Sequence, residues 1–81
     1  MDKSQVVDAC RREADRFYQG YQTDDVNNPR SRYIIECMDS KGFEFDISPP
    51  GCDGRYSLST QAACYVPTGW MARMIERVLG N

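Results

Sequence analysis

Apolar and polar positions recur with a helical period near the start of the chain. Either Asp2 or Ser4 can cap the start of a helix, and Asp2 with Gln5 has the spacing of a capping box. At about 100° per residue, the apolar and aromatic side chains that follow fall within an arc of about 120°, and charged side chains occupy the rest. The pattern predicts an amphipathic helix over residues 3–21 with Cys10 and the aromatic residues on its inward face. That face comprises Val6, Val7, Cys10, Ala14, Phe17, Tyr18 and Tyr21.

A second helix is predicted after a polar connector. Asn28 followed by Pro29 is typical of a helix cap with proline at the first helical position. The helix is expected to run to Lys41 and to stop at Gly42. Its apolar side chains cover about 200° of the circumference, which indicates contact on two sides. The run Tyr-Ile-Ile favours β structure, so a strand over residues 33–37 is the alternative.

The next segment has the alternation of a strand. Residues 43–47 read Phe-Glu-Phe-Asp-Ile, a period of two that is typical of a half-buried strand. The Ser-Pro-Pro-Gly sequence that follows ends it, because proline cannot donate to a β ladder. Residues 56–59 alternate more weakly, and we expect them to pair back on residues 43–47 as a short hairpin. Residues 61–65 fit neither pattern.

Thr68 is a candidate cap for a last helix over residues 69–79. The apolar side chains of this helix span about 200°, whereas one buried stripe needs about 100–120°. One interpretation is that the small core uses the whole arc. The other is that Trp70, Met71 and Met74 form a contact surface for a protein partner or for self-association. Tryptophan is enriched at binding hot spots, and methionine adapts to irregular surfaces.

The composition indicates a single small domain over residues 1–81. Only 14 of the 81 residues are Val, Ile, Leu or Phe, which is below the roughly 20% at which disorder becomes a concern. The net charge of −2, together with five Tyr, four Met, one Trp and four Cys, argues against disorder. A chain of this length buries only ~60% of its unfolded surface and usually needs a covalent or metal staple.

Four cysteines can supply that staple, and no two of them have the spacing of a zinc ribbon or a thioredoxin-like motif. Two disulfides are the preferred interpretation, which favours a periplasmic or secreted location. We predict the pairs Cys10–Cys37, across the two helices, and Cys52–Cys64, around the second extended segment. A four-thiolate metal site and four free thiols are the alternatives. The chain opens without a signal peptide, so export requires a native leader that has been removed.

Several kinds of chemistry are excluded or disfavoured. The chain has no histidine, which excludes Ser-His-Asp and Cys-His catalysis and every histidine-ligated metal site. Glu44, Asp46 and Asp53 could supply an acid and a base, but a short chain with so few apolar residues can hardly shape the cleft that a glycosidase needs. Residues 24–28 carry oxygen ligands but lack the central Gly and closing Glu of an EF-hand loop. We therefore expect no enzyme activity, no catalytic residue, no cofactor and no metal.

Nucleic acids and membranes are also disfavoured as partners. Basic and acidic residues interleave along the first helix, whereas nucleic-acid binding needs an excess of positive charge on one face. No apolar run approaches the ~18 residues of a membrane span.

One segment is similar to known sequences. Residues 33–43 contain the pattern Y-x-x-x-C-M-x-x-K-G-F. With Cys10 upstream on a helix, this pattern resembles small exported proteins and lipoproteins of bacteria, most of them uncharacterised. The resemblance implies a helix-to-extended corner held by a disulfide and a location in the cell envelope, with a lipid anchor in the native precursor. It carries over no catalytic residue.

Together these patterns predict an α+β, mainly α, fold of two or three helices with a short β-hairpin, stapled by two disulfides. The expected function is that of a non-enzymatic binding or structural module of the bacterial cell envelope. One alternative is a small inhibitor or immunity-type protein that blocks an enzyme through an exposed loop such as residues 48–56. The other is a thiolate metal-binding protein.

Overall fold

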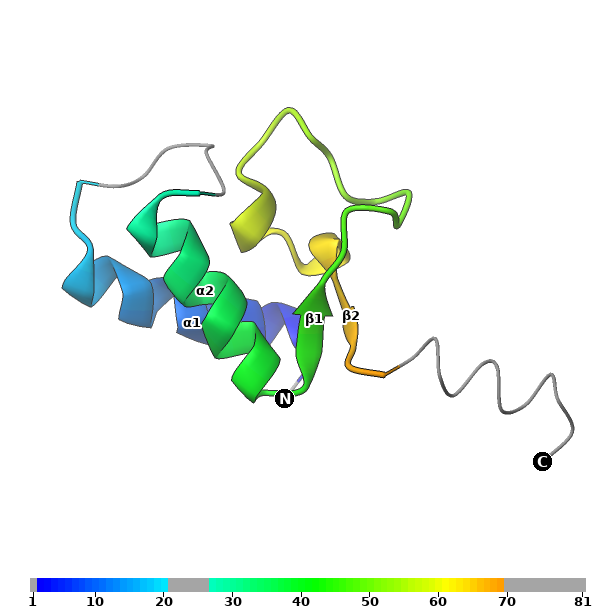
Figure 1. Ribbon diagram of the computed structural model, residues 1–81, viewed down its shortest axis with the longest axis horizontal. Coiled ribbons are helices and arrows are strands. Elements are labelled where there is room, and N and C mark those ends of the chain that lie inside the picture. Colours follow the sequence, from blue (N-terminus) through cyan, green and yellow to red (C-terminus); the bar gives the residue numbers. More distant parts are fainter. Residues whose placement is uncertain (1, 21–26, 70–81) are drawn as a thin grey trace, which may run out of the picture.

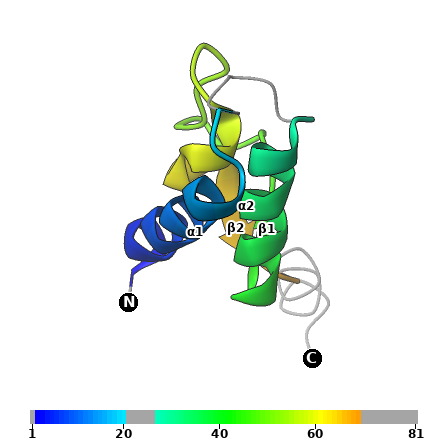
Figure 2. The same cartoon turned by 90° about the vertical axis from the view of Figure 1, so that its left-hand side faces the viewer.

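The computed structural model describes residues 2–20 and 27–69. α1 and α2 lie side by side, and β1 runs back next to the C-terminal part of α2, with β2 beside it (Figure 1, Figure 2). This arrangement confirms the expected α+β, mainly α, fold. In chain order its elements are α1 (Lys3–Phe17), α2 (Pro29–Ser40), β1 (Phe43–Phe45), the 3-10 helices η1 (Leu58–Thr60) and η2 (Ala62–Cys64), and β2 (Tyr65–Pro67).

The start of α1 is fixed by the predicted capping box. The Asp2 carboxylate accepts a hydrogen bond from the Gln5 N–H (2.9 Å), and the Gln5 side chain accepts one from the Asp2 N–H (3.1 Å). Two N–H groups that the helix itself cannot satisfy are paired in this way. The helix ends at Phe17, earlier than expected, because Tyr18 has left helical geometry (φ −129°, ψ 55°).

The inward face of α1 is shorter than the sequence pattern predicted. Val7, Cys10 and Ala14 are buried, but Phe17 is 64% exposed. The prediction that Phe17 faces the core is wrong, because this last residue of the helix lies past the point where α1 meets the core. Its ring lies beside that of Tyr33 on α2, with 5.9 Å between the ring centroids.

α2 has the predicted cap and the predicted end. The Asn28 side chain accepts a hydrogen bond from the Ser31 N–H (2.8 Å), and Pro29 is the first helical residue. Gly42 follows the C-terminal cap with φ +93°, a backbone conformation that favours glycine and turns the chain into β1. The helix contacts α1 on one side and β1 and η1 on the other, as its wide apolar arc predicted. The alternative of a strand over residues 33–37 is therefore wrong.

β1 pairs with β2, so the hairpin partner predicted for it is wrong. The two strands are antiparallel, with Phe45 opposite Tyr65 and Glu44 opposite Val66. Most of residues 56–59 lie instead in or next to η1. Burial explains the choice of partner, because Tyr65 is fully buried and its ring packs edge-on against Phe45 with 5.5 Å between the centroids. A local alternation of polar and apolar residues cannot report this distant contact.

The core is small, and both disulfides border it. Both predicted cysteine pairings are confirmed: Cys10–Cys37 joins α1 to α2 (Cα–Cα 5.8 Å), and Cys52–Cys64 ties the chain after β1 to η2 (Cα–Cα 4.8 Å). Among the described residues, no helix has the length and apolar character needed to cross a membrane. The predicted last helix, with Trp70, Met71 and Met74, lies outside the described residues. The buried apolar residues are Val7, Cys10, Ala14, Ile34, Met38, Cys64 and Tyr65.

Candidate functional site

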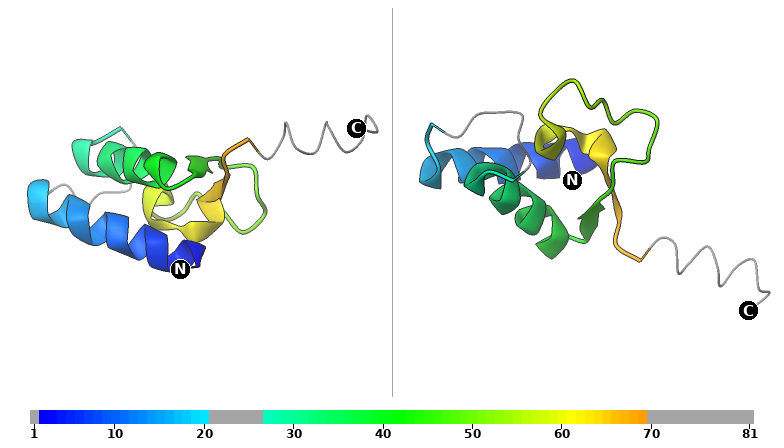
Figure 3. Two further views of the ribbon diagram at one scale, coloured as in Figure 1. Left: turned by 90° about the horizontal axis from the view of Figure 1, so that it is seen from below. Right: turned by 45° about the horizontal axis from the view of Figure 1, so that its top comes forward.

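The segment between β1 and η1, residues 46–57, is the candidate site and is called the 46–57 loop below. Both views of Figure 3 show it projecting beyond the two helices. It exposes Ile47 and Tyr56, each by 61%, and the Arg55 side chain by 82%. Tyrosine and arginine are enriched among the residues that carry binding energy at protein interfaces. The 46–57 loop therefore combines accessibility with the side chains that protein contacts use.

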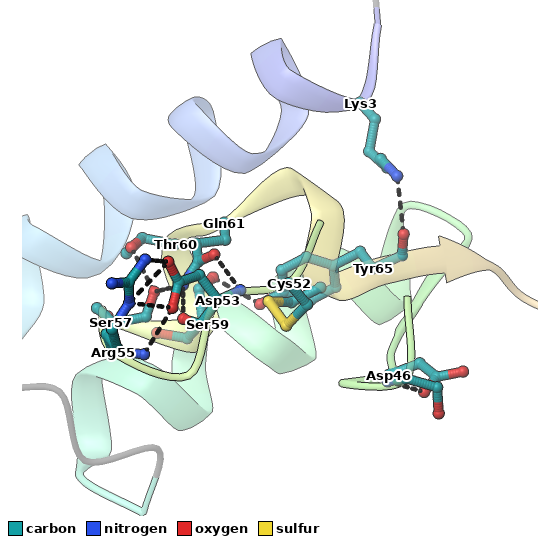
Figure 4. The surroundings of a disulfide bond; sticks show 12 residues. Lys3, Asp46, Cys52, Asp53, Arg55, Ser57, Ser59, Thr60, Gln61 and Tyr65 are labelled. Carbon is teal, nitrogen blue, oxygen red and sulfur yellow. Dashed lines mark hydrogen bonds and ion pairs between the residues drawn. A yellow bond between two sulfur atoms is a disulfide. The ribbon is translucent and has the colours of Figure 1, made fainter. Parts of the chain in front are cut away.

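Gln61, in the linker between η1 and η2, holds the middle of this loop. The Gln61 side-chain oxygen accepts a hydrogen bond from the Asp53 N–H (2.9 Å), and its amide nitrogen donates to the Asp53 carbonyl (2.8 Å). The same nitrogen lies 3.3 Å from the Ser57 carbonyl. Figure 4 shows Gln61 beside Asp53 and Ser57, next to the Cys52–Cys64 disulfide. One side chain thus satisfies backbone groups on both sides of the loop tip.

The support under the loop is anchored in the core. Cys64 and Tyr65 are fully buried, and the Tyr65 hydroxyl donates to the Ser59 carbonyl (2.7 Å). The Ser59 hydroxyl in turn donates to that of Ser31 on α2 (3.1 Å), which links η1 to the helix pair. Burial raises the pKa of Tyr65, so its phenol stays protonated and remains a donor at neutral pH.

The tip of the loop is organised by Asp53 and Arg55. The Asp53 carboxylate accepts hydrogen bonds from the Arg55 backbone N–H (3.0 Å) and from the Arg55 Nη2 (2.9 Å). The Arg55 side chain, and next its backbone N–H, lower the pKa of the Asp53 carboxyl group. The guanidinium also lies 5.8 Å from the Tyr56 ring centroid, within cation–π range. An exposed ion pair of this kind contributes little to stability, so its main effect is to orient Arg55.

The base of the loop joins the sheet and borders an apolar groove. The Asp46 N–H donates to the Cys64 carbonyl (2.8 Å), and the Asp46 carboxylate accepts from the Ser48 N–H (2.8 Å). The Ser48 backbone hydrogen bond is the main reason why the pKa of Asp46 is lowered. The groove, called the β2 groove below, has a volume of about 340 Å³. Its lining residues are Asp46, Ser48, Pro49, Val66 and Pro67.

The structure separates the carboxylates that the sequence suggested as an acid–base pair. Figure 4 shows Asp46 and Asp53 on opposite sides of the Cys52–Cys64 disulfide. Each carboxylate is engaged by its own part of the loop, Asp46 by Ser48 and Asp53 by Arg55. Glu44 lies in β1, opposite Val66. Within residues 2–20 and 27–69, no three acidic or cysteine side chains gather in a group that could hold a metal ion, and all four cysteines form disulfides.

Two arginines of α1, Arg11 and Arg12, are paired with aspartates along the helix. Arg11 contacts Asp8 (2.6 Å) and Asp15 (3.3 Å), and Arg12 contacts Asp8 (2.6 Å). The hydrogen bond from Arg11 is the largest cause of the lowered pKa of Asp8. On α2, the buried Arg30 contacts Asp15 through Nε (2.5 Å) and so joins the two helices. These contacts place the charge of Arg11, Arg12 and Arg30 beside aspartates.

Sequence reasoning found the loop but missed what holds it. Residues 48–56 were expected to be exposed in the inhibitor alternative, and the 46–57 loop contains them. Gln61 was not singled out because residues 61–65 fit neither period, and Ser59 was assigned to a weakly alternating strand instead of a 3-10 helix. The signal in the sequence for Gln61 is limited to a polar residue close to a cysteine in an irregular segment.

A scan against protein-family models, a search of curated proteins and a search of solved structures found no match to this chain.

Proposed function

We propose that the protein is a non-enzymatic binding module of the bacterial cell envelope that contacts a protein partner through the 46–57 loop. The observation that carries the proposal is that this loop is exposed and yet fixed at its middle and its base. Gln61 and the Cys52–Cys64 disulfide hold the middle, and the Asp46 hydrogen bond to Cys64 holds the base. A loop that is already ordered loses little conformational entropy on binding.

The exposed side chains indicate a contact that is mainly apolar and aromatic. Tyr56 and Ile47 present apolar surface, and Arg55 is oriented by Asp53 with its guanidinium beside the Tyr56 ring. Large exposed apolar side chains next to an ordered arginine are typical of the centre of a protein interface. The 46–57 loop is therefore a better candidate than the exposed face of α1, where Arg11 and Arg12 pair with aspartates of the same helix.

The proposed location follows from the cysteines. Two disulfides persist in oxidising compartments and are rare in the cytosol, which supports an extracytoplasmic location. The resemblance of residues 33–43 to exported bacterial proteins supports the periplasm or the cell exterior, with a lipid anchor in the native precursor. The thiolate metal-binding alternative requires four reduced cysteines. A free-thiol count on protein purified without reductant tests it, with four thiols expected for the metal protein and none for the binding module.

Site-specific photo-crosslinking in the native host tests the proposed contact. A photoreactive phenylalanine analogue at Tyr56 is expected to give a discrete adduct with a partner protein. The matched control is the same analogue at Phe17, which is 64% exposed against 61% for Tyr56 and lies at the end of α1. Equal adducts at both positions, or an adduct at Phe17 alone, would show that the 46–57 loop is not the contact surface.

The inhibitor or immunity-type alternative is supported by the same loop. A protein that blocks an enzyme presents a constrained loop to one target and binds it with 1:1 stoichiometry. If the crosslinked partner is an enzyme, adding the purified protein should inhibit it, and the Arg55→Ala and Tyr56→Ala variants should inhibit it less. A partner that is an envelope component without enzyme activity would favour the binding module.

A further inference from the structure

The β2 groove lies where the described chain ends. Val66 and Pro67 of β2 form one part of its lining, and Ser48 and Pro49 at the base of the 46–57 loop form another. The chain is held one residue before its described end, because the Thr68 N–H donates to the Gly42 carbonyl (2.8 Å). Residues 70–81 follow directly, and they contain the single tryptophan of the protein.

We propose that Trp70, in the segment of this same chain that follows Gly69, occupies the β2 groove. The observations behind the proposal are the position of the groove, the reach of the chain and the charges on both sides. The groove volume of about 340 Å³ is within the range of pockets that enclose bulky apolar groups. This assignment is an alternative to the partner contact that the sequence predicts for Trp70.

The reach of the chain allows the contact. Pro67 lines the groove, and Trp70 is three residues further along. Three extended residues span at most about 10 Å, so Trp70 stays close to the groove in every conformation. Gly69 has φ +77°, a backbone conformation that favours glycine.

The charges of the β2 groove and of residues 70–81 are complementary. Asp46 is the charged residue among those that line the groove. If residues 69–79 form the helix that the sequence predicts, Arg77 and Arg73 would lie about 20° and 60° from Trp70 on its circumference. A tryptophan in the groove would therefore bring a guanidinium near the Asp46 carboxylate.

A site three residues away on the same chain is favoured over one on a second copy. A short connection gives an effective concentration of about millimolar, which exceeds ordinary protein concentrations. Packing of Trp70 against Ser48 and Pro49 would also brace the base of the 46–57 loop.

The single tryptophan makes the test direct. In the folded 81-residue protein, Trp70 fluorescence is expected to be blue-shifted and several-fold less accessible to acrylamide than in the same protein unfolded in urea. Both properties should be independent of protein concentration. Emission and quenching equal to those of the unfolded chain would overturn the proposal. Protection that disappears on dilution would overturn it as well, because the groove would then hold a second copy or remain empty.

Two adjacent prolines provide matched variants. Pro49 lines the groove, whereas its neighbour Pro50 is exposed and outside it. Pro49→Glu is expected to shift the emission to the red and to restore quenching, and Pro50→Glu is expected to change neither. Equal effects of the two variants would overturn the proposal. In the unsubstituted protein, nuclear Overhauser effects between the Trp70 ring and the Val66 methyl groups test the same contact, and their absence would overturn it.

Discussion

Gln61 binds both the N–H and the carbonyl of Asp53, so one side chain completes the hydrogen bonding of the 46–57 loop tip. The two bonds are formed across eight residues of sequence, next to the Cys52–Cys64 disulfide. The disulfide fixes where the chain passes, and Gln61 fixes how the Asp53 backbone is oriented. Arg55 and Tyr56, two and three residues further on, are presented to solvent by this arrangement.

Replacing Gln61 by alanine is expected to destabilise the protein by about 1–2 kcal/mol, because two hydrogen bonds to partly buried backbone groups are lost. Urea unfolding measures the change in the free energy of unfolding. Gln19→Ala is the control, since Gln19 is exposed and its substitution should change the stability by less than about 0.5 kcal/mol. Amide hydrogen exchange at Asp53 should accelerate in the Gln61 variant. Unchanged exchange there would show that Gln61 does not order the loop.

Removing the disulfides is expected to unfold the domain. On the chain-entropy model, the Cys10–Cys37 and Cys52–Cys64 loops contribute about 3.5 and about 3 kcal/mol, given their sequence separations of 27 and 12 residues. A core of this size supplies only ~3–5 kcal/mol. Circular dichroism should therefore show loss of helix after reduction and alkylation of all four cysteines. A cooperative thermal transition that survives full reduction would mean that the core is stronger than its composition indicates.

The two disulfides should differ in what they hold. Replacing both Cys52 and Cys64 by serine is expected to leave the α1–α2 pair linked by Cys10–Cys37, so helical circular dichroism should be retained better than in the Cys10/Cys37 double variant. The 46–57 loop, however, loses its covalent tie to the core. Proteolysis should therefore cut the Cys52/Cys64 variant within this loop while the unsubstituted protein resists. Equal resistance of the two proteins would contradict the role assigned to the disulfide.

The helices and the cysteine pairs could be predicted because their signals are local. The capping box at Asp2 and the Asn28-Pro29 cap each lie within a few residues, and a helical period places Cys10 on the face that meets α2. The partner of β1 could not be predicted in the same way. Its choice depends on the burial of Tyr65, twenty residues away from Phe45, and a period of two says nothing about distant partners.

The candidate site was predictable in part for the same reason. Prolines, glycines and a cysteine mark residues 48–56 as a loop, so its exposure follows from composition. The hydrogen bonds of Gln61 depend on where η1 and η2 place its side chain, and the sequence carries no pattern for such short 3-10 segments. The ends of elements were also uncertain: α1 stops four residues short of the prediction because its last turn has no core to cover.

Removing the hydroxyl of Tyr65 is expected to cost about 1–2 kcal/mol of stability, because the Ser59 carbonyl loses its donor in a buried place. Tyr65→Phe keeps the ring and its contact with Phe45, so the change isolates the hydrogen bond. Tyr56→Phe is the matched control, since Tyr56 is 61% exposed and its hydroxyl can bond to water. Urea unfolding of both variants measures the difference. Equal stabilities would show that the Tyr65 hydroxyl does not support η1.

Acid is expected to loosen the 46–57 loop through Asp46 and Asp53. Hydrogen bonds from Ser48 and from Arg55 lower the pKa of these two carboxyl groups below their ordinary value of 3.8. A lowered pKa in the folded state means that the unfolded chain takes up the proton first as the pH falls. The stabilisation that the charged Asp46 and Asp53 carboxylates contribute is therefore fully present above about pH 4. It is lost as the pH falls through their lowered pKa values.

Asparagine at either position should remove the contribution of that residue to the pH dependence. Asp46→Asn and Asp53→Asn are expected to be less stable than the unsubstituted protein at pH 6 and to approach its stability below the lowered pKa values. Asp39→Asn, at an exposed position of α2 outside the loop, serves as the control for the loss of one charge. Urea unfolding between pH 2 and pH 6 gives the stability curves, and NMR titration of the carboxyl carbons gives the midpoints directly. Midpoints at or above 3.8 for both residues would show that the Ser48 and Arg55 hydrogen bonds do not hold the loop in solution.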